Sequence, residues 1–273
     1  MRACIAPLGA LALAAANVLA SLGHDVVIFD SYGRCSPILE DVRVPEKIRL
    51  VDAPPSSKPL SRLLRRCEAL LLALDPWDAG ACNDWGRVVV GYALDALSSS
   101  VERIVVTVPA GAYAWSSERV ECGVLPKVPP PVYEYSIPLS AAILLSSRLD
   151  SLLVVTIPPL IHVEGCVVSG RPERLNWFER LLRTSVLEAR PEAKLSILDY
   201  RDAAETLALY LEGEVIGWVC VGGVTLDARR VAEKLGYKAL SLMQPDTIVV
   251  EGGGARRRTL RLLESLGLWN VHG

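Results

Sequence analysis

Several features are scarce in this chain, and each scarcity excludes a class of protein. Its 273 residues carry a net charge of −2 at pH 7, without the basic and aromatic interleaving of a nucleic-acid-binding surface. The three histidines are far apart and no Cys-x-x-Cys pair occurs, so we expect no metal site. Beyond the N-terminal segment, no window approaches the ~18 uncharged apolar residues of a membrane span. We therefore expect a cytoplasmic protein with neither nucleic-acid nor membrane partners.

Glutamine, asparagine and methionine are also scarce, and Gln244 is the only glutamine of the chain. Together with abundant Arg, Glu and Pro, this composition is typical of a thermophile protein. Intracellular disulfides occur in hyperthermophiles, so some of the seven cysteines are candidates for disulfide pairing. The sequence assigns no pairs.

The first 30 residues carry the most informative pattern of the chain. An apolar run at 3–5 leads into a turn at 6–12, a helix-like segment follows, and a second apolar strand ends at Asp30. A strand, a tight turn, a helix and a strand that ends in an acid form the frame of a dinucleotide-binding unit. A secretory signal peptide is the alternative interpretation. Against it, Pro7 and Asn17 interrupt the apolar stretch, and the strand before Asp30 needs a partner element.

Strands and helices continue to alternate after Asp30, which favours a parallel sheet covered on both faces. The pattern weakens beyond Pro158, and Pro138 should kink or delay the helix that contains it. We predict an α/β fold, a Rossmann-type doubly wound parallel sheet with a smaller C-terminal lobe. Its domains are expected at 1–157 and 158–273, the second returning in part to the main sheet. The predicted elements are strands ending at 52 and covering 69–74, 103–108 and 152–156, and helices at 60–66, 83–96 and 132–147.

These landmarks, taken in order, resemble the extended short-chain dehydrogenase/reductase family, in its NAD-dependent epimerase/dehydratase branch. The resemblance covers nearly the whole chain and depends on spacing as much as on identity. The matching positions are Ala6, Gly9 and Ala12 for the glycine-rich turn, Gly23-His24, Asp30, Asp52, Asn83-Asp84-Trp85-Gly86, the segment 103–113, Thr156-Ile157-Pro158 and Asp202, expected to be buried.

The resemblance implies a cofactor site at the carboxyl ends of the first strands. The helix start near Gly9 would attract phosphate, although Pro7 removes one amide donor. Asp30 would accept both ribose hydroxyls of NAD and repel the 2′-phosphate of NADP, so NAD is the expected cofactor. The alternative is that Asp30 merely caps a buried strand. The implied cofactor-binding residues are Ala6, Leu8, Gly9, Ala10, Leu11, Asp30, Asp52, Ala53, Ala73 and Asn83.

The resemblance also locates a catalytic triad that this chain does not keep. Tyr133 falls at the position of the tyrosine acid/base, but the serine position is Pro109 and the lysine position is Ile137. Neither replacement can donate a hydrogen bond from its side chain, and a phenol without a neighbouring cation keeps a pKa near ~10. Realignment onto Tyr135 does not restore the lysine. Thr107 would lie one pleat deeper in the preceding strand.

A second glycine-rich turn follows the strand expected at 247–250. Gly253, Gly254 and Arg256 there, at the start of an amphipathic helix, suit a phosphate or carboxylate. In the resembling family this lobe holds the nucleotide of a nucleotide sugar, and Arg171 and Arg174 belong to another segment of the same cleft. The alternative is a flexible loop with a solvated basic face.

Three functions remain open. The first, which we favour, is a catalytically silent NAD-binding relative, a pseudoenzyme that serves as a regulator or as a subunit of an assembly. The second is an active NAD-dependent oxidoreductase or epimerase that uses Tyr133 on a nucleotide-sugar-like substrate. The third is a structural interaction module without cofactor. The resemblance further implies a homodimer formed through the helices around Asn83 and Val132.

Overall fold

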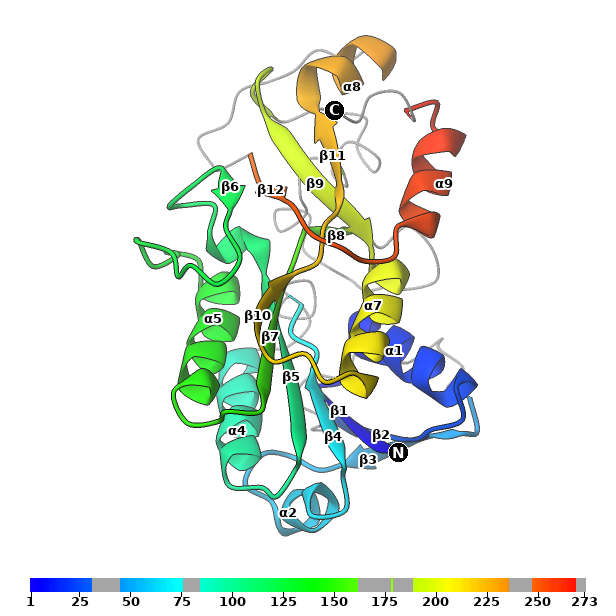
Figure 1. Ribbon diagram of the computed structural model, residues 1–273, viewed down its shortest axis with the longest axis vertical. Coiled ribbons are helices and arrows are strands. Elements are labelled where there is room, and N and C mark those ends of the chain that lie inside the picture. Colours follow the sequence, from blue (N-terminus) through cyan, green and yellow to red (C-terminus); the bar gives the residue numbers. More distant parts are fainter. Residues whose placement is uncertain (31–44, 76–83, 162–177, 179–188, 236–246, 269–273) are drawn as a thin grey trace.

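The computed structural model describes residues 1–30, 45–75, 84–161, 178, 189–235 and 247–268. Its main sheet has seven parallel strands in the order β10-β7-β5-β4-β1-β2-β3 (Figure 1). The chain builds outward from β1 to β3 and then crosses to the other side of β1 with β4. This arrangement confirms the predicted Rossmann-type sheet. The strands are β1 (Arg2–Ala6), β2 (Asp25–Asp30), β3 (Ile48–Asp52), β4 (Ala69–Leu72), β5 (Arg103–Pro109), β7 (Leu152–Ile157) and β10 (Gly217–Cys220).

Helices cover both faces of this sheet because side chains alternate along each strand. On one face, α1 (Ala10–Ser21) and α7 (Tyr200–Glu212) pack against a core that includes Ile5 and Ile28. On the other face, α2 (Lys58–Leu64), α4 (Trp85–Leu97) and α5 (Tyr133–Ser146) pack against a core that includes Phe29 and Leu72. The strands are apolar on both sides, as expected of a sheet buried between two helix layers.

Local hydrogen bonds account for the differences from the predicted element boundaries. Helix α2 begins at Lys58 because the Ser57 hydroxyl accepts a hydrogen bond from Leu60 N, at 3.2 Å. Strand β4 ends at Leu72, two residues early, and Leu74 N donates to Thr107 Oγ1 at 2.6 Å. Helix α5 runs from Tyr133 through the buried Pro138, so the proline does not delay this helix.

The C-terminal part of the chain forms smaller sheets and then returns to the main one. Strand β9 (Lys194–Asp199) lies between β11 (Val224–Asp227) and β8 (Leu160–Ile161), and β6 (Arg119–Val120) pairs with β12 (Val249–Val250). Helices α8 (Ala228–Leu235) and α9 (Arg257–Ser265) complete this part. Strand β10 forms an edge of the main sheet, and α7 packs on α1. The division into domains at 157/158 stays a prediction.

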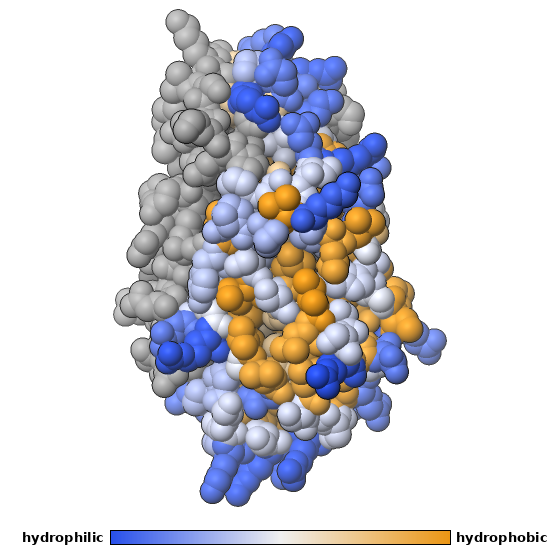
Figure 2. Space-filling model, turned by 90° about the vertical axis from the view of Figure 1, so that its left-hand side faces the viewer, coloured by the Kyte–Doolittle hydropathy of each residue, from blue (hydrophilic) through white to orange (hydrophobic). Residues whose placement is uncertain are grey.

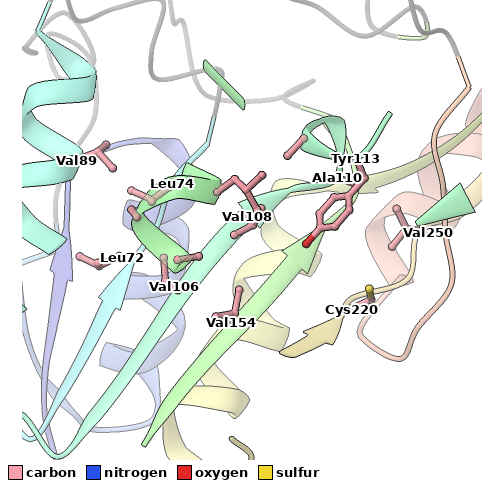
Figure 3. Packing of buried hydrophobic residues seen from close by; sticks show 14 of the residues in the cluster. Leu72, Leu74, Val89, Val106, Val108, Ala110, Tyr113, Val154, Cys220 and Val250 are labelled. Carbon is pink, nitrogen blue, oxygen red and sulfur yellow. The ribbon is translucent and has the colours of Figure 1, made fainter. Parts of the chain in front are cut away.

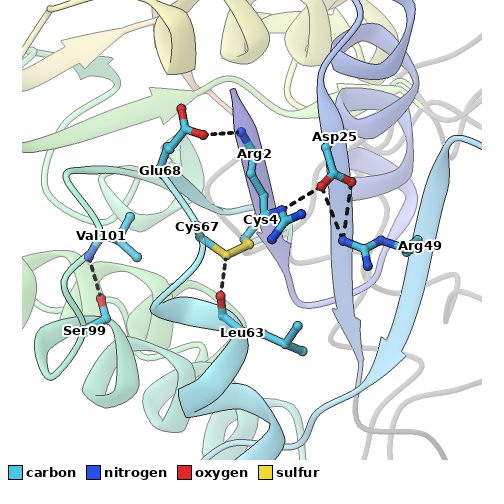
Figure 4. Close-up of a disulfide and its surroundings, with 9 residues drawn as sticks. All are labelled: Arg2, Cys4, Asp25, Arg49, Leu63, Cys67, Glu68, Ser99 and Val101. Carbon is cyan, nitrogen blue, oxygen red and sulfur yellow. Dashed lines mark hydrogen bonds and ion pairs between the residues drawn. A yellow bond between two sulfur atoms is a disulfide. The ribbon is translucent and has the colours of Figure 1, made fainter.

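Two disulfides cross-link the described chain. Cys4 of β1 is bonded to Cys67, which precedes β4, and their Cα atoms are 5.9 Å apart (Figure 4). Cys122 is bonded to Cys220 at the end of β10, with Cα atoms 5.6 Å apart. These bonds bear out the expectation that some cysteines pair. None of the helices in the described ranges is both long and apolar enough to cross a membrane.

Charged side chains surround the Cys4–Cys67 disulfide at the amino-terminal edge of the main sheet. Arg2 Nε donates to Asp25 Oδ2 at 2.6 Å, and Arg49 Nη2 lies 3.4 Å from the same carboxylate (Figure 4). The hydrogen bond from Arg2 lowers the pKa of Asp25 below its usual value, and the charge of Arg49 acts in the same direction. These residues lie at the opposite end of the strands from the predicted cofactor site.

Candidate cofactor and substrate site

The predicted phosphate-binding turn lies at the carboxyl end of β1, where the strand order reverses between β1 and β4. Helix α1 begins after Gly9, whose backbone is extended and which has no side chain to cap the helix. The first turn of a helix has amides without intrahelical partners, and its positive dipole end favours an anion. Ala73 continues the pairing of the two strands, because its N–H donates to Ala6 O at 2.9 Å. The structure therefore brings together Ala6, Leu8, Gly9, Ala10, Leu11 and Ala73, all of them buried.

The predicted adenosine-binding acids lie side by side at the ends of β2 and β3. Asp30 and Asp52 are partners in the parallel register, and Ala53 N donates to Asp30 O at 2.8 Å. Asp30 is fully buried and Asp52 is exposed. A helix start next to an acid at the end of the second strand fits the adenosine and phosphate half of a dinucleotide. Asn83 lies outside the described residues.

Tyr133 faces helix α4 rather than the end of β5. A Cβ added to Gly86 of α4 would overlap the Tyr133 hydroxyl, so this glycine makes room for the tyrosine. The Tyr133 side chain is nevertheless 49% exposed. The glycine of the Asn-x-x-Gly pattern thus has a packing role between α4 and α5.

Tyr135, not Tyr133, lies beside the loop that follows β5. Its ring covers Gly111, where an added Cβ would lie 2.5 Å from Tyr135 Cε1. Gly111 is two residues beyond Pro109, the position of the missing serine. The sequence did not favour Tyr135 as the catalytic tyrosine, because Leu139 stands at the lysine position four residues later. The signal that could have singled it out is the glycine at 111, which allows an aromatic ring to approach the backbone closely.

The remaining side chains near the end of β5 have structural roles. Ile137 is half-buried and packs against the apolar core. Thr107 is buried, and its hydroxyl accepts from Leu74 N and lies 3.0 Å from Leu74 O, joining β5 to the end of β4. The Tyr113 ring is buried among Ala110, Val108 and neighbouring apolar side chains (Figure 3). Its hydroxyl lies 3.5 Å from Thr156 Oγ1, and burial raises the pKa of this phenol.

The second glycine-rich turn packs closely against the chain that leaves β10. A Cβ on Gly252 would overlap Cys220 O and lie 2.8 Å from Gly222 N, whereas a Cβ on Gly253 would meet nothing within 4 Å. Gly253 forms a β-bridge with Val221, and Gly254 has a φ of +130°. At Gly252, the absent side chain therefore allows two parallel backbone segments to lie close together.

Replacement of Gly252 by alanine is expected to lower the free energy of unfolding by about 2 kcal/mol, because the contacted atoms are backbone and cannot move aside. Gly253→Ala is the matched control, and its effect should stay within about 0.5 kcal/mol. Urea unfolding followed by circular dichroism measures both. Equal losses in the two variants would contradict the packing interpretation.

Arg256 follows this turn, and its guanidinium donates a hydrogen bond to Gly252 O. The neighbouring Arg258 pairs with Glu205 and Asp202, and the hydrogen bond that it donates to Glu205 raises the pKa of Arg258. The predicted basic face is thus partly neutralised within the chain. Arg171 and Arg174 lie outside the described residues, so the structure joins only Gly253, Gly254 and Arg256 of the predicted anion-binding set.

Asp202 is fully buried, as the resemblance implied. Its carboxylate accepts from Thr259 N and Thr259 Oγ1, both at 2.8 Å, and from Arg258 N at 3.1 Å. It therefore joins the start of α7 to the start of α9. Within the described ranges, no three His, Cys, Asp or Glu side chains are grouped so that they could hold a metal ion.

No protein-family model and no curated protein sequence matches the chain. Solved structures with low sequence identity do match, over nearly the whole length. One is the UDP-N-acetylglucosamine 4-epimerase of Methanobrevibacter ruminantium in complex with UDP-N-acetylmuramic acid, with a TM-score of 0.68, 13% identity and coverage of 99% of this chain and 97% of that one.

Two further matches have bound ligands of different kinds. The dTDP-glucose 4,6-dehydratase of Bacillus anthracis in complex with NAD has a TM-score of 0.68 at 10% identity, covering 99% of this chain and 95% of that one. The UDP-glucose 4-epimerase of Thermotoga maritima with UDP-glucose has a TM-score of 0.64 at 15% identity, covering 98% and 93%. The chain thus has the fold of NAD-dependent epimerases and dehydratases of the extended short-chain dehydrogenase/reductase type.

Proposed function

We propose that this chain binds NAD in its Rossmann-type site and does not catalyse hydride transfer. The observation that carries the proposal is a contrast between the two halves of the site. The phosphate and adenosine half keeps the start of α1 after Gly9 and the acid Asp30. The half at the end of β5 has Pro109 and Ile137 where a hydroxyl and a cation are needed. NAD-bound neighbours with the same fold support the cofactor.

Each retained residue has a defined task toward the cofactor. The Asp30 carboxylate would accept hydrogen bonds from both hydroxyls of the adenosine ribose, and its charge would repel the phosphate of NADP. The amides at the start of α1 would bind the pyrophosphate. NAD, when bound, supplies a hydride acceptor.

Hydride transfer to NAD also requires that a proton leave the substrate, and the residues that would carry out this proton transfer are missing. Tyr133 directs its hydroxyl at α4, and Tyr135 lies beside Gly111. Helix α5 carries no lysine, since the nearest one in the sequence is Lys127. In the family that the chain resembles, a lysine four residues after the tyrosine gives electrostatic help to its proton transfer, and Ile137 or Leu139 stands at that position here. Loss of such electrostatic help typically costs orders of magnitude in rate. A silent subunit with a regulatory or assembly role is consistent with these losses.

Binding of a nucleotide sugar or another small anion is a second part of the proposal. Two structural neighbours were solved with UDP-sugars. Here Gly253, Gly254 and Arg256 lie in the C-terminal part next to the end of β10, where an anion could reach a guanidinium. Arg171 and Arg174 belong to the same proposal on sequence grounds.

A homodimer through α4 and α5 is the third part. Figure 2 shows apolar side chains gathered on the face of the molecule that carries these helices. Among the described residues of these two helices, the exposed large hydrophobic side chains are Leu94, Tyr133 and Ile143. Contiguous exposed apolar surface marks an interaction site more often than a solvated one. Sedimentation velocity should report twice the 29.6 kDa mass of the chain, and a monomer at micromolar concentration would contradict this part.

Calorimetric titration tests the cofactor proposal, with Asp30→Ala as the informative variant. The wild-type chain should bind NAD and discriminate against NADP. Loss of two hydrogen bonds to a charged group should weaken NAD binding about 10- to 100-fold, and discrimination against NADP should disappear. Asp25→Ala is the matched control, because Asp25 lies at the opposite end of β2, and it should leave both affinities unchanged. If the wild-type chain binds neither dinucleotide, the structural-module hypothesis replaces this one.

A further inference from the structure

The turn between β3 and α2 is held at three points by one face of helix α4. We call the residues 53–57 the β3–α2 turn. The Tyr92 hydroxyl donates to Ala53 O at 3.1 Å, and Ser56 N donates to Asp95 Oδ2 at 2.6 Å. Between them, Gly91 lies directly beneath Pro55. Three consecutive contacts from one helix face fix the position of this turn.

Tyr92 is the buried contact. Its ring is 3% exposed within the core cluster that contains Ala53 and Phe29. Burial raises the pKa of this phenol far above its usual value, and the nearby negative charges of Asp30, Asp52 and Asp95 act in the same direction. Tyr92 is therefore a neutral hydrogen-bond donor at neutral pH. A buried hydroxyl that lost its acceptor would be left unsatisfied at a cost in free energy, so this hydrogen bond holds Ala53 in place.

Gly91 is the contact that permits close approach. A Cβ at this position would overlap Pro55 Cβ and lie 2.9 Å from Pro55 Cγ. A glycine inside a helix costs about 1 kcal/mol relative to alanine, so helix propensity does not explain it. Because the proline ring is rigid, an added methyl group would move the turn. Ser56 next to it has a φ of +62°, a left-handed conformation that the bond to Asp95 holds.

The turn begins where the proposed adenosine site ends. Ala53 N donates to Asp30 O, so the first residue of the turn is bonded to the residue expected to hold the ribose. Beyond the ribose, the base of a dinucleotide would lie across the ends of β2 and β3, beside the exposed Asp52. A purine amino group is a donor that a carboxylate accepts.

We propose that Gly91, Tyr92 and Asp95 are positioning residues that hold the β3–α2 turn as the wall of an adenine pocket. This inference rests on the proposed NAD binding and goes beyond it, because it assigns the adenine end of the site to helix α4. These three contacts, which we call the clamp, hold the turn in place before the nucleotide arrives. Preorganisation of this kind raises affinity by reducing the ordering cost.

Titration with adenosine 5′-monophosphate and with NAD tests the clamp. Gly91→Ala should raise the dissociation constant for both ligands about 10-fold, which corresponds to ~1.4 kcal/mol. Tyr92→Phe keeps the ring and removes only the anchor, and it should act in the same direction. Ser98→Ala, at the exposed end of the same helix, is the control and should leave both constants unchanged. The titrations are run where circular dichroism shows each variant to be folded.

The outcomes separate the two proposals. Wild-type affinities retained in both Gly91→Ala and Tyr92→Phe would overturn the clamp while leaving NAD binding intact. Failure of the wild-type chain to bind either ligand would overturn the proposed function and the adenine pocket with it. A loss in the Ser98→Ala control equal to that in the Gly91→Ala and Tyr92→Phe variants would show that α4 acts only through general stability, and this result also overturns the clamp.

Discussion

Removal of the Cys122–Cys220 disulfide should lower the free energy of unfolding by about 4–5 kcal/mol. The two residues are 98 positions apart. A disulfide stabilises a protein mainly by lowering the entropy of the unfolded chain, and for a loop of about 100 residues this effect is about 4–5 kcal/mol. The disulfide joins the segment after β6 to the end of the edge strand β10. The other disulfide in the described ranges, Cys4–Cys67, lies elsewhere in the sheet and cannot replace it. Urea unfolding of Cys122→Ser, Cys220→Ala and the double variant measures the loss.

The pattern across these variants is the control. Either single substitution breaks the bond, so each should lose nearly as much as the double variant. Additive losses in the two single variants would show that the thiols do not form a bond. Alkylation of the denatured, unreduced protein gives an independent check. At most three of the seven cysteines should react, namely Cys35, Cys82 and Cys166, because Cys4 and Cys67 are bonded as well.

Replacement of Asp202 by alanine is expected to destabilise the chain by about 4 kcal/mol. The substitution leaves the buried Thr259 N–H and hydroxyl without their acceptor and separates Arg258 from a carboxylate. It also disconnects the start of α9 from the start of α7. Thermal unfolding with a chemical-denaturant series gives the value.

Glu205→Ala is the matched control for Asp202. Glu205 also pairs with Arg258, but its side chain is 37% exposed, and an exposed ion pair contributes less than about 1 kcal/mol. Asp202→Asn keeps one acceptor and should fall between the two. A loss in Asp202→Ala no larger than that in Glu205→Ala would contradict a structural role for the buried carboxylate.

The fold was predictable because its information is local. Apolar runs such as 69–74, separated by helical patterns, can be read without tertiary knowledge, and each predicted strand lies close to its predicted place. The sequence did not predict β6, β8, β9, β10 and β11. The element ends were less predictable, since they depend on single side-chain bonds such as that of Thr107 to Leu74. The disulfide pairs could not be assigned, because pairing depends on which elements become neighbours.

The site was predictable in its frame but not in its side-chain directions. Spacing placed Asp30 and Asp52 at neighbouring strand ends, where the parallel register joins them. It could not show that Tyr133 faces Gly86 or that Tyr135 covers Gly111, because both orientations follow from how α5 packs on α4 and on the loop after β5. The close approach of the Gly252 backbone to the Cys220 carbonyl could not be predicted either, because three consecutive glycines are equally typical of an anion-binding loop.

The central claim is that the cofactor frame persists while the catalytic side chains are gone. It is tested most directly by nucleotide-sugar turnover in protein saturated with NAD, with bound NAD confirmed in the same sample. Incubation with UDP-glucose, UDP-N-acetylglucosamine and dTDP-glucose, followed by product chromatography, should give no conversion above that of heat-inactivated protein. Epimerised or dehydrated product that disappears in Tyr133→Phe or Tyr135→Phe would contradict the account.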